Sequence, residues 1–154
     1  HGAELMRAVV QRTGWSEVSV NGDCVGRAAA GLTVLLGVGL EDTETDGNYK
    51  ADKIANLRIF EDDAGKMNRS VLDVSGQILA ISQFTLYGDC RKGRRPGFDQ
   101  AAPAEQPKVL SENFVAQLGA KGIVVACGQF QATMKVTLEN QGPVTLLIDS
   151  GKSF

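Results

Sequence analysis

The chain has 154 residues, of which 43% are hydrophobic and 22% are charged, and its formal net charge is −2. This composition is typical of a single globular domain with a substantial core, and it excludes a protein that is basic over its whole surface. A nucleic acid must therefore be bound by a local basic patch, and we expect no DNA partner. No apolar run reaches the ~20 residues that a membrane helix requires, so we expect no membrane partner either.

Histidine and cysteine usage limits the chemistry that the chain can perform. The only histidine is His1, within residues 1–5 (HGAEL), which we interpret as the remnant of an expression tag. The domain proper, residues 6–154, then contains no histidine, which excludes a Ser-His-Asp or Cys-His catalytic unit and a histidine metal site. Three widely separated cysteines indicate reduced thiols in a cytoplasmic protein: Cys24, Cys90 and Cys127. We expect neither a metal nor a cofactor.

The first half of the domain predicts strands followed by one helix. In order, we expect a strand at 6–12, a hairpin at 16–28, a strand at 32–40 and a helix at 46–58. Asn21-Gly22 is the strongest short-range signal for a hairpin turn. The nearly continuous apolar run at 32–40 predicts a strand that is buried on both faces. Thr45 or Asp46 is expected to be the N-cap of the helix.

The second half predicts one more helix between strands. In order, we expect a polar, turn-rich segment at 61–76, a strand at 77–86, a loop at 87–103, a helix at 105–122 and strands at 123–128, 132–139 and 143–149. The last two strands flank Asn140–Pro143, which in the simplest interpretation is a turn. Several strands and hairpins with two separated helices predict an α+β fold in a single domain, with a mainly antiparallel sheet or a partly closed β-barrel.

A strongly basic segment follows the strand at 77–86. Four cations occur within five residues around one glycine: Arg91, Lys92, Arg94 and Arg95. A loop of this kind can bind phosphates, and Phe84, Tyr87 and Phe98 offer aromatic surfaces for bases. The alternative, given equal weight on these residues alone, is a solvated loop whose arginines pair with surface carboxylates.

Ser82 and Thr85 are candidate nucleophiles near the end of the same predicted strand. Each would need a base, and nothing in the spacing favours Lys92, the lysine of the neighbouring loop. Hydroxyl groups that bond to the backbone are therefore the favoured interpretation. These residues leave two possible functions open, which are a Thr85-dependent esterase and a non-catalytic RNA-binding module.

Two short segments carry a resemblance to a known family. SQFTL at 82–86 and NQGPVT at 140–145 resemble the two signature motifs of the D-aminoacyl-tRNA deacylases, and the likeness extends over essentially the whole chain after Leu5. It implies a homodimeric hydrolase that cleaves the ester bond between a D-amino acid and tRNA, with the acceptor end of aminoacyl-tRNA as its partner. The chain departs from the family pattern at three places: Gly97, Gln131 and residues 13–18.

The resemblance implies that the second motif selects the substrate. A cis Gly142-Pro143 bond would enter the pocket of the other subunit, with its carbonyl groups facing the α-amino group of the substrate. An L side chain would collide with this segment, whereas achiral glycine would not, so glycyl-tRNA should be cleaved too. Arg12 is expected to hold the segment in place. The other expected substrate-binding residues are Phe130, Met134 and Asn140.

The resemblance also implies that the first motif holds the ester and the terminal adenosine. Its expected catalytic residues are Ser82, Gln83, Phe84 and Thr85. The backbone N–H groups of Phe84 and Thr85 would polarise the ester carbonyl as an oxyanion hole does, and the Phe84 ring would face the adenine. Without a histidine, the 2′-hydroxyl of the tRNA is the group expected to activate water. The four cations of the basic loop are expected to contact the tRNA.

Overall fold

A computed structural model of the protein describes residues 6–149; the expected tag remnant at 1–5 lies outside them. The strands are β1 (Arg7–Val20), β2 (Asp23–Ala28), β3 (Gly31–Gly37), β4 (Phe60–Glu61), β5 (Met67–Arg69), β6 (Gln77–Ser82), β7 (Val125–Cys127) and β8 (Lys135–Asp149). The helices are α1 (Glu44–Asn56), α2 (Glu105–Ala120) and the 3-10 helix η1 (Phe84–Tyr87). Within the described residues, no helix is long and apolar enough to cross a membrane.

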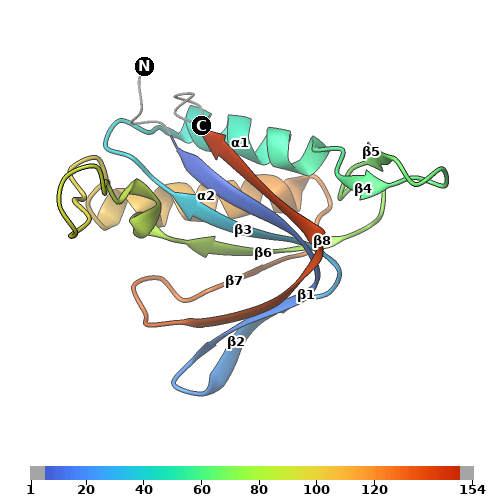
Figure 1. Cartoon of the computed structure of the whole chain (residues 1–154), viewed down its shortest axis with the longest axis horizontal. Coiled ribbons are helices and arrows are strands. Elements are labelled where there is room, and N and C mark those ends of the chain that lie inside the picture. Colours follow the sequence, from blue (N-terminus) through green and yellow to red (C-terminus); the bar gives the residue numbers. More distant parts are fainter. Residues whose placement is uncertain (1–5, 150–154) are drawn as a thin grey trace.

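One mixed sheet organises the domain. Its strand order is β2-β1-β3-β6-β7, and β8 pairs with β1 as well. The pairs that β1 makes with β2, β3 and β8 are antiparallel, whereas β3–β6 and β6–β7 are parallel. The long strands β1 and β8 curve together, and β2 comes into contact with β7 (Figure 1). The sheet is therefore nearly closed into a barrel, which confirms the predicted α+β fold.

The central strands β3 and β6 are buried on both faces, as the apolar run at 32–40 predicts for β3. Leu32, Val34 and Leu36 of β3 face a core that is shared with α1 and α2, whereas Leu35 packs into a second cluster inside the barrel. Strand β6 alternates in the same way between the two clusters. Both helices lie on one side of the sheet (Figure 1), so the period-2 pattern of each central strand fills two separate cores.

Several predicted boundaries need correction. Helix α1 begins at Glu44, and Thr43 forms its capping box with Asp46, so neither Thr45 nor Asp46 is the N-cap. The strand predicted to reach residue 86 ends at Ser82, because the chain turns into η1 there. The polar segment after residue 60 contains the short hairpin β4–β5. The strand predicted at 6–12 continues without a break to Val20.

The segment Asn140–Pro143 is not a hairpin turn. Both halves of β8 pair with β1, and the partner of Gln11 is Thr145 whereas the partner of Thr13 is Asn140. One residue of β1 therefore stands opposite four residues of β8, which form a bulge. In a hairpin the two halves would pair with each other. Their polarity pattern is the same in both cases, which is why the strand pattern alone could not exclude a turn.

Candidate active site

A cavity of about 490 Å³ opens beside η1. Its walls come from the end of β6, η1, the start of α2 and the loop before β8. They are formed by Val38, Ser82, Gln83, Phe84, Thr85, Ala102, Ala104, Pro107, Phe130, Gln131, Ala132 and Met134. All four predicted catalytic residues are thus brought together with Phe130 and Met134. None of these described lining residues is ionisable, so the walls contain no general acid or base of their own.

The Ser82–Tyr87 turn presents backbone donors to this cavity. At its entry the Gln83 N–H donates to the Leu36 carbonyl oxygen at 2.8 Å, which ties the turn to β3. Phe84 and Thr85 begin a helical turn, where N–H groups have no intrahelical acceptor. Within residues 6–149 no other acceptor meets them. The turn therefore has two unused N–H groups, and both belong to residues that line the cavity.

Within the same turn, the side chains of Phe84 and Thr85 are exposed. The Gln83 amide donates to the Thr85 hydroxyl at 2.9 Å. No lysine, carboxylate or histidine in the described part of the chain lines the cavity near this hydroxyl, and Lys92 lies in the exposed loop. Phe84 is 57% exposed, and its ring packs against that of Phe98, with the two centroids 5.0 Å apart. An aromatic face is therefore available at the mouth of the cavity.

A second cavity of about 410 Å³ adjoins the first. The two share Ser82, Phe130 and Met134, and the second extends between β6, β7 and the side of α2. The hydroxyl of Ser111 lies in its wall, buried and without a hydrogen-bond partner among the described residues. The two hollows together form one concave, mostly apolar region, as is usual for small-molecule sites.

Gln131 occupies a special backbone position at the edge of the cavity. Its φ is 61°, in the left-handed region that glycine adopts most easily. The family resemblance leads to the expectation of glycine there, and the backbone geometry gives the physical reason. Gln131 therefore keeps the conformation and adds a side chain to the rim of the pocket.

The Gln141–Val144 bulge lies at a distance from the cavity. Neither it nor Arg12 contributes to the lining of the two cavities beside η1. In Figure 1 the bend of β8 is at the right, whereas the segment that follows β6 is at the left. A single chain thus does not bring the two motifs together, and Asn140 is equally remote from the Ser82–Tyr87 turn.

The bulge is held by side chains on both sides. Arg12 donates through Nε to the Gln141 carbonyl oxygen at 2.9 Å and through Nη1 to the Ile59 carbonyl oxygen at 2.8 Å. The Asn140 side chain accepts from the Val144 N–H at 2.7 Å, so it closes the bulge from inside. The bond between Gly142 and Pro143 is cis, and both residues are exposed. Among the described residues, nothing donates to their carbonyl oxygens.

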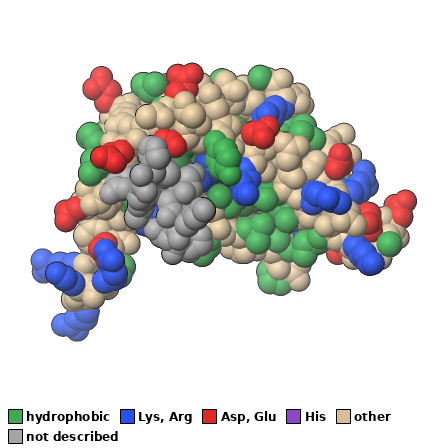
Figure 2. Space-filling model, turned by 90° about the horizontal axis from the view of Figure 1, so that it is seen from above, with side chains coloured by type: hydrophobic (Ala, Val, Ile, Leu, Met, Phe, Trp, Pro, Cys, Tyr) green, Lys and Arg blue, Asp and Glu red, His purple; other side chains and the backbone are tan. Residues whose placement is uncertain are grey.

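The basic loop projects from the domain at the same end as the cavity. Figure 2 shows its cations as a separate blue cluster, and Asp89 and Gly97 close the loop with two backbone hydrogen bonds of 2.7 and 2.8 Å. The Arg91 guanidinium binds Asp89 through two contacts of 2.9 and 2.7 Å and holds the pKa of that carboxyl well below its usual range. The charges left for a ligand are mainly those of Lys92, Arg94 and Arg95.

Sequence reasoning missed the small residues of the cavity wall. Ala102, Ala104 and Pro107 belong to a stretch that reads simply as a loop leading into a helix. They line the site because the Ala102 N–H donates to the Val38 carbonyl oxygen, which fastens the end of the loop to the end of β3. No local pattern could have revealed this contact. Within the described residues, no cluster of histidine, cysteine or carboxylate side chains could hold a metal ion.

Comparison with known proteins relates this chain to one family of enzymes. The sequence model of the family described as D-Tyr-tRNA(Tyr) deacylase matches residues 9–149. A relative named D-aminoacyl-tRNA deacylase from Desulfitobacterium hafniense is 60% identical over 149 residues, which are 97% of this chain and 100% of the relative. Another of that name, from Symbiobacterium thermophilum, is 55% identical over 150 residues, with 97% and 99% coverage.

Two solved structures share the fold. One, described as a c-Myc DNA unwinding element binding protein, has a TM-score of 0.87 and 40% identity and covers 94% of this chain and 98% of its own. The other, described as a probable eukaryotic D-amino acid tRNA deacylase, has a TM-score of 0.81 at 19% identity with the same coverage, and it supports the fold alone. From the family match and the curated relatives together, the chain belongs to the D-aminoacyl-tRNA deacylases, hydrolases that act on an ester bond.

Proposed function

We propose that the active unit is a homodimer in which each cavity is completed by the Gln141–Val144 bulge of the other subunit. The observation that carries this proposal is the separation of the two motifs within one chain. The Ser82–Tyr87 turn offers unused N–H donors, and the bulge offers unused carbonyl acceptors. An aminoacyl ester needs both, because its carbonyl oxygen accepts hydrogen bonds and its α-ammonium group donates them.

Within this composite site, the ester carbonyl is bound by the N–H groups of Phe84 and Thr85. They stabilise the negative charge that develops on this oxygen when water attacks. The terminal adenine lies against the exposed ring of Phe84. The remaining walls, including Phe130 and Met134, exclude water from the apolar side of the substrate. Because no described residue that lines the cavity of about 490 Å³ is ionisable, the 2′-hydroxyl of the tRNA assists the attacking water.

Selection is steric and uses the main chain. The carbonyl groups of Gly142 and Pro143 bind the α-ammonium group, and the bulge occupies the space that an L side chain would need. A D side chain points away from it and is accepted. Glycine has no side chain to reject, so glycyl-tRNA is also a substrate. The basic loop holds the acceptor end through Lys92, Arg94 and Arg95, and the protein acts in the cytoplasm, where aminoacyl-tRNA is used.

The first test compares the deacylation of D- and L-tyrosyl-tRNA by the wild type and by Thr85→Ala. We expect turnover of the D form, within about tenfold in the variant, because the catalytic group of residue 85 is its N–H. A hydroxyl nucleophile would lose several orders of magnitude. A tRNA ending in 2′-deoxyadenosine should be bound and left intact. Rapid cleavage of this substrate would refute the role given to the 2′-hydroxyl.

A second test uses glycyl-tRNA with the same enzyme preparation. We expect its cleavage at a rate comparable to that of D-tyrosyl-tRNA, whereas L-alanyl-tRNA, with one methyl group more, remains intact. The two aminoacyl groups differ only by the methyl group that the bulge is proposed to reject. If both esters survive while D-tyrosyl-tRNA is cleaved, selection depends on recognition of the D side chain and the steric proposal is wrong.

A further inference from the structure

A buried ion pair lies directly behind the Ser82–Tyr87 turn, at the start of β1. Arg7 Nε is 3.3 Å from the Asp149 carboxylate, whose side chain is fully buried, while 19% of the Arg7 side chain is exposed. The two residues are cross-strand partners in the β1–β8 pair. A buried pair of this kind is often no more stabilising than apolar residues of the same size, because both charges lose their hydration. Stability alone therefore does not explain why this buried ion pair is present.

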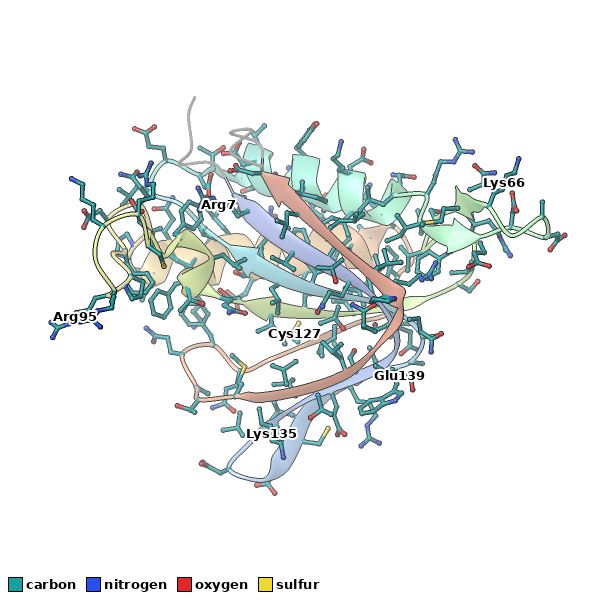
Figure 3. All side chains as sticks on the ribbon, in the orientation of Figure 1. Arg7, Lys66, Arg95, Cys127, Lys135 and Glu139 are labelled. Atoms are coloured by element: carbon teal, nitrogen blue, oxygen red, sulfur yellow. The ribbon has the colours of Figure 1, made fainter. Side chains whose placement is uncertain are left out.

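Arg7 also contacts the turn itself, in two ways. Its Nη1 donates to the Leu86 carbonyl oxygen at 3.0 Å, and its guanidinium carbon lies 4.6 Å from the centroid of the Tyr87 ring. Figure 3 shows Arg7 at the end of the sheet next to the start of the basic loop. The planar guanidinium can satisfy a carboxylate, a carbonyl oxygen and an aromatic face at once, which an ammonium group cannot.

The place where the turn rests on the sheet is Gly37, the cross-strand partner of Arg7 in β3. A Cβ atom at this position would lie 3.0 Å from the Leu86 Cβ and 3.2 Å from the Tyr87 ring. The turn thus packs directly on the backbone of β3. The row Asp149–Arg7–Gly37 runs across three neighbouring strands, and the turn lies against its end.

We propose that Arg7, fixed by Asp149, is the positioning residue that aims the N–H groups of Phe84 and Thr85 into the cavity. Leu36 holds the entry of the turn through the bond to Gln83, and Arg7 holds its exit at Leu86. The 3-10 helix has only four residues, and two of them, Phe84 and Thr85, lie between these two anchors. A shift at the exit therefore reorients the N–H groups at its beginning. This inference rests on the proposed function, which assigns those groups to the ester carbonyl.

The main test variant is Arg7→Lys. It keeps the positive charge beside Asp149, but a single ammonium group cannot also serve the Leu86 carbonyl oxygen and the Tyr87 face. Asp149 has a second cation nearby, since its charge raises the pKa of the buried Lys50 against the stronger lowering effect of burial. The carboxylate is therefore not left alone when Arg7 is changed. The matched control is Arg27→Lys, which alters the exposed ion pair with Glu17 on the β1–β2 hairpin.

The first readout is the backbone amide spectrum of the free protein. We expect the ¹⁵N–¹H signals of Phe84 and Thr85 to move in Arg7→Lys and to stay in place in Arg27→Lys. Asp149→Asn, which releases Arg7 without removing it, should move the same two signals by a smaller amount. Unmoved signals in both Arg7→Lys and Asp149→Asn would overturn the positioning proposal, whatever the activity of the variants.

The second readout separates binding from chemistry. With D-tyrosyl-tRNA, we expect kcat of Arg7→Lys to fall by about 100-fold, because small displacements of a catalytic group have effects of this size. KM should change less than about threefold, and the melting temperature should stay close to that of Arg27→Lys. A loss of rate that merely follows the unfolded fraction would overturn the proposal. If the two signals move while kcat is unchanged, Arg7 does position the turn, and the catalytic role proposed for the N–H groups fails instead.

Discussion

The Ser82–Tyr87 turn and the Gln141–Val144 bulge are both held by arginines of β1, but they leave opposite hydrogen-bonding groups unused. Arg7, near the start of β1, donates to a carbonyl oxygen of the turn, and Arg12, five residues later, donates to a carbonyl oxygen of the bulge. The turn is left with unused donors and the bulge with unused acceptors. One strand thus fixes the two regions that we propose to form one site across a homodimer.

The two regions also differ in their surroundings. The turn rests on buried residues, with Tyr87 2% exposed and burial raising the pKa of its hydroxyl far above the usual value. The bulge is exposed at Gln141, Gly142 and Pro143 and is held by hydrogen bonds and by the packing of Val144 against the core. A buried support suits groups that must stay aimed during the reaction, whereas an exposed, stiff segment suits insertion into a partner.

The largest effect is expected from Gly142→Ala in the bulge. Gly142 has a φ of 137°, and an added Cβ atom would lie 2.8 Å from the Val144 side chain and 3.0 Å from Arg12 Nη2. The bulge must rearrange, and we expect kcat/KM for D-tyrosyl-tRNA to fall by about 100-fold or more. The fold should persist because the site is exposed, as a near-native circular dichroism spectrum and melting curve would show.

Mixing two inactive variants tests whether the bulge acts in the other subunit. Gly37→Ala damages the turn, so a heterodimer with Gly142→Ala contains one site with two intact halves. After unfolding and joint refolding at equal concentrations, we expect about a quarter of the wild-type rate, because about half of the dimers are mixed and each has one good site of two. Activity that stays at the level of the separate variants would show that each chain uses its own bulge.

The basic loop should affect binding rather than chemistry. For the triple variant Lys92→Ser, Arg94→Ser and Arg95→Ser, we expect KM to rise about tenfold near physiological salt and kcat to change less than about twofold. The dependence of log KM on log salt concentration should become shallower by about 2, from three lost phosphate contacts. Arg91→Ser serves as the control, since Asp89 already offsets that charge, and it should change KM much less.

Arg12 should influence stereochemical selection more than turnover. Arg12→Met removes the hydrogen bonds to the Gln141 and Ile59 carbonyl oxygens, so the bulge gains freedom without a steric clash. We expect the ratio of D- to L-tyrosyl-tRNA cleavage to fall by about tenfold. Arg58→Met is a matched control, because Arg58 also binds a carbonyl oxygen, that of Asn68, away from the bulge. An equal loss of selectivity in both variants would contradict the role of Arg12.

The smallest effect on activity is expected at Asp42, on the turn side of the molecule. Burial raises the pKa of its carboxyl to about 7, from 3.8. The folded protein then binds a proton that the unfolded chain has lost, so the stability that this group contributes is present below pH 4 and is lost as the pH rises to about 7. The change is about 1.4 kcal/mol per pKa unit, a few kcal/mol in all.

The variant that isolates this effect is Asp42→Asn. Its amide oxygen can still accept from the Gly39 N–H, and the Asp42 main-chain oxygen, which accepts from the Gln106 side chain at 2.6 Å, is unchanged. Urea unfolding at pH 4.5, 6 and 8 should show a shallower pH dependence than in the wild type, while kcat stays within about twofold. If the stability of Asp42→Asn depends on pH as steeply as that of the wild type, another group is responsible for the pH dependence.

The sequence by itself determined the elements that depend on local patterns. The Asn21-Gly22 hairpin, the doubly buried strand β3 and helix α2 follow from turn chemistry and hydrophobic periodicity, and the two motifs follow from the residues themselves. The absence of histidine after residue 1 already limited the chemistry. These features could be predicted because each is set by residues that are neighbours along the chain.

The tertiary structure alone decided how these elements are used. Alternation cannot distinguish a hairpin from a bulge, so only the register with β1 revealed that Asn140–Pro143 interrupts one strand. The row Asp149–Arg7–Gly37 joins residues that are up to 142 positions apart, and no local pattern announces it. Long-range pairing between strands brings such residues together. It also places the two motifs on opposite sides of the folded domain.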